Sequence, residues 1–312
     1  MTDNRTAAVT GATGFIGKRL ASVLEADGWT VRRFVRQGKG AGIVGTGDLA
    51  TADSLDEALA GCGTVYHLAG HAHVTRNAAD DEAQFEAANH IATRRMAEAA
   101  ARAGCGRFVF VSTIKVHGET TDGREPFGPA DAPAPEDTYA QSKWRAEEAL
   151  RDVAAQTGLA FAIVRPPLVF SGEASGNIAR LVGLLRRGLP LPLAGIANRR
   201  SLIGLDNLAG LLAHLGRAPA IPGVPLLPHD ITLSTPDLLR RVAALKGASA
   251  RLFPLPAGLL EALLRAAGRS EDAARLFGSL EIAADALPAG LGWQPRPDGN
   301  PLIAASPGRR LS

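Results

Sequence analysis

Tyr139 and Lys143 lie four residues apart in the segment TYAQSKWRAEE, in a chain of 312 residues that contains two tyrosines and five lysines. The segment predicts a helix over residues 139–158, capped by Asp137 or Thr138, and this spacing places both side chains on one helix face. An ammonium beside a phenol stabilises the phenolate, which lowers the pKa of the tyrosine. We therefore expect Tyr139 to exchange a proton with the oxygen of an alcohol or a sugar. Because this spacing is common on exposed helix faces, the hypothesis depends on where the pair lies in the fold.

A hydroxyl group is the third member of this set. The apolar run at residues 107–112 predicts a strand that ends in Ser112-Thr113, shortly before the helix that carries Tyr139. Thr113 could hold the reacting oxygen beside the phenol. Alternatively, it is an ordinary hydroxyl at a strand end that satisfies the backbone.

Three glycines follow the first predicted strand. The segment VTGATGFIGKRL places Gly11, Gly14 and Gly17 between a strand at residues 7–10 and a helix at residues 15–27. The first glycine permits a tight turn, the second lets the backbone approach a pyrophosphate at the positive helix end, and the third permits close helix packing. Such glycines can also serve as plain turns, but the strand–turn–helix context predicts a dinucleotide site. A bound nicotinamide would exchange the hydride that accompanies the proton at Tyr139, and its positive charge would lower the phenol pKa further.

The end of the second predicted strand indicates which dinucleotide binds. Sites that hold a ribose 2′-hydroxyl usually place an acid there, whereas this strand reads TVRRFVRQ and has none. Arg36 stands at the expected point, and its guanidinium can pair with a 2′-phosphate. Arg32, Arg33 and Arg36 could instead be solvated surface charges. The sequence favours NADP(H), with Arg36 as its ligand, and leaves NAD(H) possible.

The elements around these residues alternate between short apolar runs and amphipathic stretches. Strands are predicted at residues 7–10, 30–35, 64–69, 107–112 and 160–165, with helices at 15–27, 54–59, 83–103 and 139–158. This alternation predicts an α/β fold with a Rossmann-type, doubly wound parallel sheet. After Pro166-Pro167 the chain is rich in proline and glycine, with short helices predicted at 177–187, 205–216 and 234–245. We expect a Rossmann domain at residues 1–167 that regains about 201–218, and a smaller, discontinuous, mainly helical substrate cap within 168–312.

Composition excludes several classes of protein. The net charge is +3 and the arginines are scattered, so no nucleic-acid partner is expected. No apolar stretch reaches ~18 residues, so no membrane insertion is expected. Cys62 and Cys105 are too few to staple a domain, and the start of the sequence shows no signal peptide, so we expect a cytoplasmic protein. His67 is expected to be a packed core histidine, and His71 and His73 have no further ligands nearby, so no metal site is predicted.

Together these motifs resemble the extended short-chain dehydrogenase/reductases of the nucleotide-sugar epimerase/dehydratase family. The matching segments are TGATGFIG, GDL, HLAG, EAANHIAT, VSTIKVHGE, YAQSK, RPPLVF, NRRSLIGLDNLA and LGWQP, which follow the family's order over nearly the whole chain. The resemblance implies a Rossmann domain with a C-terminal substrate cap, a UDP-sugar substrate and a homodimer. It departs from the family at His117, where the motif usually has a tyrosine, and at the missing acid after the second strand.

The resemblance also implies roles for individual residues. Thr113 takes the place of the catalytic Ser/Thr, Tyr139 that of the acid/base, and Lys143 that of its tuning partner. Cofactor contacts are expected from Gly11, Thr13, Gly14, Phe15, Ile16, Gly17, Arg36, Asp48, Leu49, Leu68, Ala69, Gly70, Asn89, Tyr139, Lys143 and Pro166. Substrate contacts are expected from His71, Lys115, His117, Asn177, Arg200 and Arg275, the last three at the substrate diphosphate.

The segments VSTIKVHGE and RRSLIGLDNLAG resemble bacterial polysaccharide enzymes that reduce UDP-4-keto-6-deoxy-N-acetylhexosamines, including those that form UDP-N-acetylquinovosamine. They also resemble UDP-glucose and UDP-N-acetylglucosamine 4-epimerases, which keep NAD bound and usually retain the acid missing here. We therefore expect a 4-ketoreductase that uses NADPH, with a 4-epimerase as the alternative. A dehydratase would carry a carboxylate pair where this chain has Ile114-Lys115. A non-catalytic dinucleotide sensor would generally lose Tyr139 or Lys143.

Overall fold

Six parallel strands form the larger sheet, in the order β3-β2-β1-β4-β5-β6. The computed structural model describes residues 4–72, 78–172, 176–221, 223–266, 268, 273 and 276–304. The strands are β1 (Thr6–Thr10), β2 (Thr30–Val35), β3 (Ile43–Gly45), β4 (Thr64–His67), β5 (Arg107–Val111) and β6 (Ala160–Val164). The predicted doubly wound parallel sheet is confirmed, with β3 as a short edge strand that the sequence analysis missed. The order reverses between β1 and β4, where such sheets leave a crevice at the carboxyl ends of the strands.

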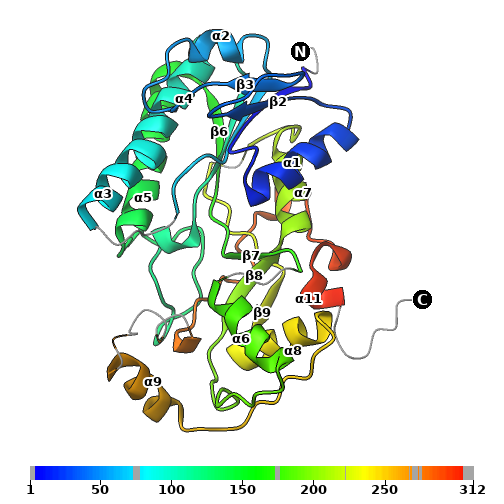
Figure 1. The fold of residues 1–312 in the computed structure, drawn as a ribbon. Coiled ribbons are helices and arrows are strands. Elements are labelled where there is room, and N and C mark those ends of the chain that lie inside the picture. The colour runs from blue at the N-terminus through cyan, green and yellow to red at the C-terminus, as the bar shows by residue number, and fades with distance from the viewer. Residues whose placement is uncertain are drawn as a thin grey trace.

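Helices cover both faces of this sheet (Figure 1). One layer contains α1 (Phe15–Ala26) and α7 (Leu205–Leu215), and the other contains α2 (Leu55–Leu59), α4 (Ala92–Arg102) and α5 (Thr138–Thr157). Alternate residues of β1 serve the two layers, because Ala7 and Val9 pack with α1 and α7 whereas Ala8 packs with α4 and α5. Burial on both faces explains why the central strands are continuous apolar runs rather than alternating ones.

The helical segment before β5 is longer and less regular than predicted. It consists of α3 (Ala78–Phe85), a π-helical turn η1 (Glu86–Ile91) and α4 (Ala92–Arg102), where the sequence predicted one helix over residues 83–103. A π-helical turn inserts an extra residue into the helix and is found frequently at functional sites. In this chain the turn contains Asn89, whose side chain is fully buried.

The smaller second part is mainly helical, as predicted, and it also contains a three-stranded sheet that the sequence analysis did not predict. Its elements are β7 (Leu168–Phe170), β8 (Arg200–Gly204), β9 (Ile231–Leu233), α6 (Gly176–Arg186), α8 (Thr235–Leu245), α9 (Ala257–Ala266), α11 (Pro301–Ala304) and the single turns η3 (Ala289–Leu291) and η4 (Pro297–Gly299). β8 lies between β7, to which it is parallel, and β9, to which it is antiparallel. β7 and β9 have three residues each, which is too few to produce a readable period in the sequence, and β8 runs directly into α7.

The return of residues 201–218 to the first domain stays a prediction. β8 belongs to the small sheet, but Leu208, Leu211 and Leu212 of α7 join the core between α1 and the large sheet. The two parts therefore share packing at α7.

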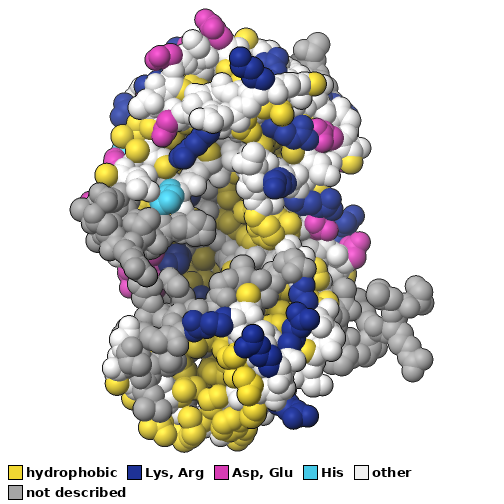
Figure 2. Space-filling view, in the orientation of Figure 1, with side chains coloured by type: hydrophobic (Ala, Val, Ile, Leu, Met, Phe, Trp, Pro, Cys, Tyr) yellow, Lys and Arg dark blue, Asp and Glu magenta, His cyan; other side chains and the backbone are white. Residues whose placement is uncertain are grey.

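Two surface properties bear on possible partners. Among the described helices, none is both long enough and apolar enough to cross a bilayer. On the face drawn in Figure 2, lysines and arginines are spread over both parts rather than gathered into one stripe. The absence of a nucleic-acid partner, expected from composition, stays a prediction.

Candidate active site

A cleft of about 540 Å³ lies at the carboxyl ends of β1, β2 and β4, where the strand order reverses. Its predicted lining residues are Gly11, Thr13, Gly14, Arg36, Asp48, Leu49, Leu68, Ala69, Gly70 and His71. The sequence analysis missed other residues that line it, namely Phe34, Val35, Gln37, Thr46, Gly47, Ala88 and Ala92. A signal for Thr46 and Gly47 was present in the segment IVGTGD, an apolar pair followed by glycines, but a strand of three residues was not recognised there.

The glycine turn leaves no room for side chains. Gly11 has φ +65°, and a Cβ there would lie 2.8 Å from the backbone nitrogen of Ala69. A Cβ on Gly17 would lie 2.2 Å from the carbonyl oxygen of Gly11, so the third glycine lets α1 pack on the turn. Gly14 is the N-cap residue of α1 and makes no side-chain cap hydrogen bond. Backbone N–H groups of the first turn are therefore available to an anion. This geometry fits the pyrophosphate of a dinucleotide.

A buried chain of hydrogen bonds holds the ends of β1 and β4 together. The Thr10 hydroxyl accepts from the backbone N–H groups of Leu68 and Ala69, both at 3.1 Å, and lies 2.8 Å from Nδ1 of His67. His67 Nε2 lies 3.1 Å from the Thr93 hydroxyl, which donates to the carbonyl of Asn89. These donors and acceptors require a neutral His67 with its proton on Nε2. Burial lowers the pKa of His67 to about 3, which keeps it neutral.

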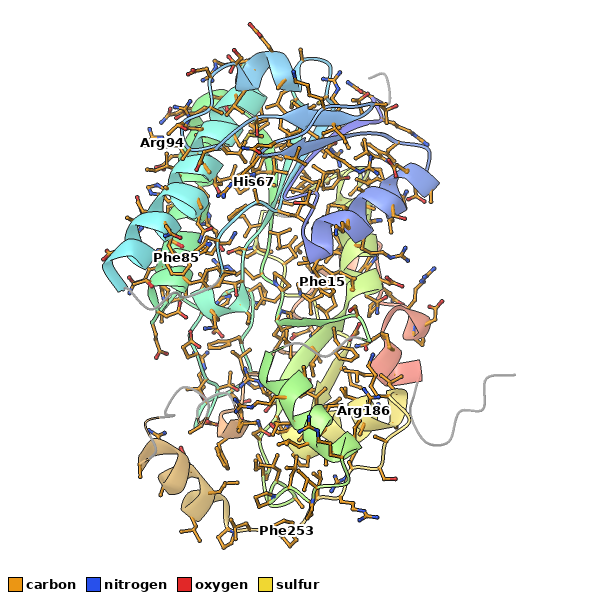
Figure 3. The ribbon with its side chains drawn as sticks, viewed as in Figure 1. Phe15, His67, Phe85, Arg94, Arg186 and Phe253 are labelled. Carbon is orange, nitrogen blue, oxygen red and sulfur yellow. The ribbon has the colours of Figure 1, made fainter. Side chains whose placement is uncertain are left out.

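His67 is therefore the core histidine that the sequence analysis expected. Figure 3 shows His67 within the sheet, between α1 and the helix α3, which carries Phe85. No group of three or more His, Cys, Asp or Glu side chains among the described residues could hold a metal ion. His73 lies outside the described residues.

Asn89 connects the cleft to the helix that carries Tyr139. Its Oδ1 accepts from the His71 backbone N–H at 2.7 Å, and its Nδ2 donates to the His71 carbonyl at 3.0 Å and to Ser142 Oγ at 2.8 Å. Ser142 in turn donates to the carbonyl of Tyr139 at 2.7 Å. One amide therefore fixes the loop at the end of β4 relative to the first turn of α5. The resemblance predicted that Asn89 supports the active-site end of the cofactor, and the observed contacts agree with support through backbone positioning.

Thr113, Tyr139 and Lys143 come from the end of β5 and the first two turns of α5. Asp137 caps α5 by accepting from Ala140 N at 2.6 Å, as one of the two predicted caps. The Thr113 hydroxyl lies next to the Tyr139 phenol and interacts with it. The Tyr139 ring packs 5.9 Å, between centroids, from the Phe85 ring.

Lys143 lies in the interior, next to the cleft. It is 4% exposed, its Nζ lies 4.2 Å from the centre of the Phe110 ring, and a Cβ added to Gly70 would lie 3.8 Å from that nitrogen. Gly70 lines the cleft, so the ammonium lies beside the end of the cleft nearest α5. The three predicted catalytic residues therefore lie near one another, at the place where a dinucleotide in the cleft would end.

The pKa of Tyr139 differs from the expectation. Burial raises it to about 12, an effect that the hydrogen bond with Thr113 opposes and the charge of Asp137 increases. Burial also lowers the pKa of Lys143 to about 7, although Glu147 opposes this shift. Proximity to lysine therefore does not lower the tyrosine pKa in the cofactor-free protein, because desolvation outweighs the attraction. The phenol is protonated at neutral pH and is ready to donate a proton.

The buried lysine should reduce the stability of the cofactor-free protein, so Lys143→Met should increase it. Between about pH 7 and pH 10.5 the unfolded chain binds the lysine proton and the folded protein does not. The stability of the wild type should therefore rise across this range, and the advantage of Lys143→Met should be largest at or below pH 7, at roughly 2 to 4 kcal/mol. Urea unfolding of both proteins at several pH values measures it. An advantage that does not change with pH would contradict this explanation.

Three further residues that were predicted to contact the cofactor lie outside the cleft lining. Phe15 begins α1 and is half exposed, Ile16 packs against the core, and the carbonyl of Pro166 accepts from Ile114 N at 3.1 Å. Asp48 lines the cleft and accepts from Ala50 N at 2.9 Å, so it also caps its own turn.

The structure places the candidate substrate residues in different surroundings. His71 lines the cleft, and Lys115 lies on the turn η2 (Ile114–Val116) directly after Thr113. His117 is buried below that turn, and Arg200 donates to the carbonyl of Gly278 at 3.0 Å within the cap. The side chain of Asn177 and the whole of Arg275 lie outside the described residues. The structure does not bring His117 to the surface of the cleft, because its Nε2 lies 2.7 Å from Nη1 of Arg165 in the core.

A buried ion pair under the site escaped the sequence analysis. Arg165 binds Glu147 with two hydrogen bonds, from Nε at 2.9 Å and from Nη2 at 2.6 Å, and both side chains are almost fully buried. Ser112, the neighbour of Thr113, donates to Glu147 Oε1 at 2.6 Å. Glu147 follows Lys143 by one helical turn, and this spacing on an inward-facing helix surface was the available signal.

Comparison with known proteins places this arrangement in a family. Residues 7–221 match the NAD dependent epimerase/dehydratase family. The chain belongs to this family. It is 32% identical over 298 residues to a UDP-glucose 4-epimerase of Vibrio cholerae, an alignment that covers 92% of this chain and 90% of the relative. It is also 32% identical over 259 residues to a ceramide reductase of Caulobacter vibrioides, covering 80% of this chain and 73% of the relative.

The fold has close counterparts among solved structures. MoeE5 in complex with UDP-glucuronic acid and NAD superposes with a TM-score of 0.73 at 23% identity, covering 96% of this chain and 98% of that chain. The resemblance to extended short-chain dehydrogenase/reductases and the Rossmann-type fold are therefore confirmed.

Proposed function

We propose that this protein is an NAD(P)-dependent oxidoreductase that acts at C4 of a UDP-linked hexose. The leading reaction is the reduction of a UDP-4-keto-6-deoxy-N-acetylhexosamine by NADPH, to a product of the UDP-N-acetylquinovosamine type for bacterial surface polysaccharide. The observation that carries the proposal is the placement of the Thr113 hydroxyl and the Tyr139 phenol beside buried Lys143, near the end of the glycine-turn cleft.

Each residue of this set has a distinct role in the proposed reduction. When bound, the dinucleotide supplies the hydride. Tyr139 donates its proton to the oxygen that becomes an alkoxide at C4, and Thr113 holds that oxygen by a hydrogen bond. Lys143 presents a positive charge to the phenolate that Tyr139 becomes after donating its proton. Asn89 keeps the cleft loop and the first turn of α5 in register.

One feature of the cleft favours reduction by NADPH over the other chemistry of the family. The cleft carries Arg36 at the end of β2 and no acid there, which suits the 2′-phosphate of NADPH. Arg32 binds the carbonyls of Ala58 and Ala60, and Arg33 binds Glu25, so of the three predicted arginines Arg36 is the one in the cleft.

A UDP-hexose 4-epimerase is the second candidate, favoured by the relative from Vibrio cholerae. In that reaction Tyr139 as phenolate would remove the proton of the C4 hydroxyl, and hydride would return to the opposite face of the 4-ketose. Because the phenol must first lose its proton, this reaction needs the cationic nicotinamide to lower the Tyr139 pKa. The homodimer and the cytoplasmic location expected from the sequence stay predictions.

One set of incubations separates the candidates. Purified protein is mixed with UDP-4-keto-6-deoxy-N-acetylglucosamine and NADPH, and separately with UDP-glucose or UDP-N-acetylglucosamine without added cofactor. Loss of NADPH absorbance with a new C4 alcohol seen by NMR supports the reductase, whereas conversion without added cofactor supports the epimerase. A keto-ceramide precursor with NADPH is the comparison substrate, because one relative is a ceramide reductase. Turnover of that lipid alone, or of none of these compounds, would contradict the proposal.

Arg36→Ala should weaken NADPH binding by about 10- to 100-fold and leave NADH binding nearly unchanged. The reason is that a charge-assisted pair with the 2′-phosphate is lost, and NADH has no such phosphate. Calorimetric titration of both dinucleotides measures the effect. Arg33→Ala is the matched control, because Arg33 pairs with Glu25 at 2.6 Å and does not line the cleft. An unchanged preference for NADPH over NADH in Arg36→Ala would rule out this role.

A further inference from the structure

Lys115 lies between two carboxylates at the edge of the site. Its Nζ is 2.8 Å from Asp137 Oδ2 and 2.9 Å from Glu119 Oε1. All three side chains are partly buried, with 31% to 41% of their side-chain surface exposed. Both contacts of the Lys115 ammonium lie within the protein, so they compete with its predicted role in binding substrate.

The contacts of Lys115 join the two segments that carry Thr113 and Tyr139. Its backbone N–H donates to Thr113 Oγ1 at 3.4 Å, while its ammonium holds Asp137. Asp137 uses its second oxygen to cap α5 at Ala140 N. Together with the interaction between the Thr113 hydroxyl and the Tyr139 phenol, these contacts form a closed set that includes the first turn of α5.

We propose that Lys115 is a positioning residue for Tyr139. Its ammonium holds the Asp137 carboxylate, and with it the first turn of α5, against the turn that carries Thr113, and it balances the negative charge that lies beside the phenol. The assignment depends on the proposed function only in taking Tyr139 as the group that transfers the proton.

The charges around the phenol make this balance measurable. Asp137 and Lys143 belong to α5 and its cap, Lys115 belongs to η2, and Glu119 lies in the segment after η2. His71 of the cleft loop packs against the Phe85 ring, which in turn packs against the Tyr139 ring. Asp137 is the carboxylate whose charge raises the Tyr139 pKa. Burial opposes the charge of Lys115, but its bonds to Asp137 and Glu119 outweigh this and raise the pKa of Lys115, so it stays an ammonium. Without that ammonium, Asp137 would act on the phenol uncompensated.

The composition of the chain permits a direct test on the phenol itself. Tyr66 and Tyr139 are its two tyrosines, so a Tyr66→Phe background leaves a single phenol at position 139. Growth on 3,5-difluorotyrosine labels that phenol and lowers its intrinsic pKa, which brings the titration into a range where the protein stays folded. The midpoint is then read from the ¹⁹F chemical shift against pH, with circular dichroism as the check on folding.

The expected midpoints differ in sign between the variants. Lys115→Met should raise the midpoint by roughly half a unit or more, and Asp137→Asn, which keeps a capping side chain, should lower it. The double variant should return close to the background protein, as should Lys115→Arg. Lys246→Met removes a lysine at the end of α8 in the cap and should not shift the midpoint.

Two results would overturn the assignment. One is an unchanged midpoint in Lys115→Met, and the other is a shift of both single variants in the same direction, which would indicate general loosening of the site. If Lys115→Met fails to fold, Asp137→Asn decides, and a midpoint that does not fall rejects the proposal. The titration uses neither substrate nor dinucleotide. Its outcome is therefore independent of whether the proposed sugar reaction is correct.

Discussion

Tyr139→Phe is expected to lower kcat of the nicotinamide-linked reaction by a factor of about 10² to 10⁴, with little change in KM. The substitution removes one hydroxyl and leaves the ring, which packs on Phe85. The hydroxyl lies next to Thr113 and is protonated at neutral pH, so its loss removes the proton donor and leaves the developing alkoxide without its acid. Steady-state rates with the preferred substrate of the wild type measure the effect.

Tyr66→Phe is the matched control for this variant. Tyr66 is fully buried on β4, and among the described residues its hydroxyl has no hydrogen-bond partner. Removing that oxygen should leave turnover unchanged and should not lower stability, because an unsatisfied buried polar group is removed. Full activity in Tyr139→Phe would eliminate the proposed mechanism. Dinucleotide binding without turnover in the wild type would instead favour a non-catalytic sensor.

Arg165→Met is expected to lower the free energy of unfolding by about 3 to 5 kcal/mol. The variant leaves Glu147 without its bidentate partner, in a position where the carboxylate is fully buried. Ser112 and the half-exposed Arg151 still contact Glu147, at 2.6 Å and 3.1 Å, but they replace only part of the lost interaction. Chemical denaturation at neutral pH measures the change.

A double variant and a surface control separate a buried charge from lost packing. Arg165→Met combined with Glu147→Leu should recover a large part of the lost stability, because no unpaired charge remains. Arg240→Met breaks an ion pair with Asp237 in which both side chains are about half exposed, and it should change stability by less than about 0.5 kcal/mol. Equal losses in the single and double buried variants would show that packing rather than charge accounts for the effect.

The buried pair also explains a connection between stability and the site. Glu147 lies one helical turn after Lys143 on α5, and Ser112 lies next to Thr113 at the end of β5. Arg165 follows β6 directly, so the pair ties the helix that carries Tyr139 to the ends of two neighbouring strands. On the other side Arg165 contacts His117, whose pKa burial lowers to about 4, so that this imidazole stays neutral beside the guanidinium.

Local patterns in the sequence determined most of the large domain. Five of the six parallel strands were predictable, because a strand buried on both faces must be apolar at every position. The glycine turn was predictable for a similar reason, since Gly11 and Gly17 occupy places where a Cβ would meet backbone atoms within 3 Å. The placement of Tyr139 and Lys143 on one helix face followed from helix geometry alone, as did Asp137 as one of two candidate caps. Strands β3, β7 and β9 were missed because each has three residues, and β8 was missed because it runs directly into α7.

Tertiary structure decided the electrostatics of the site. The sequence indicated that a lysine near a tyrosine would lower the tyrosine pKa, but the fold buries Lys143, and desolvation of the phenol raises the Tyr139 pKa to about 12. The partners of Lys115 and Arg165 were equally invisible, because Asp137 and Glu147 lie 22 and 18 residues away along the chain. The physical reason is common to these cases. Spacing along a chain determines which side chains share a face, whereas desolvation and ion pairing depend on what the rest of the fold packs against that face.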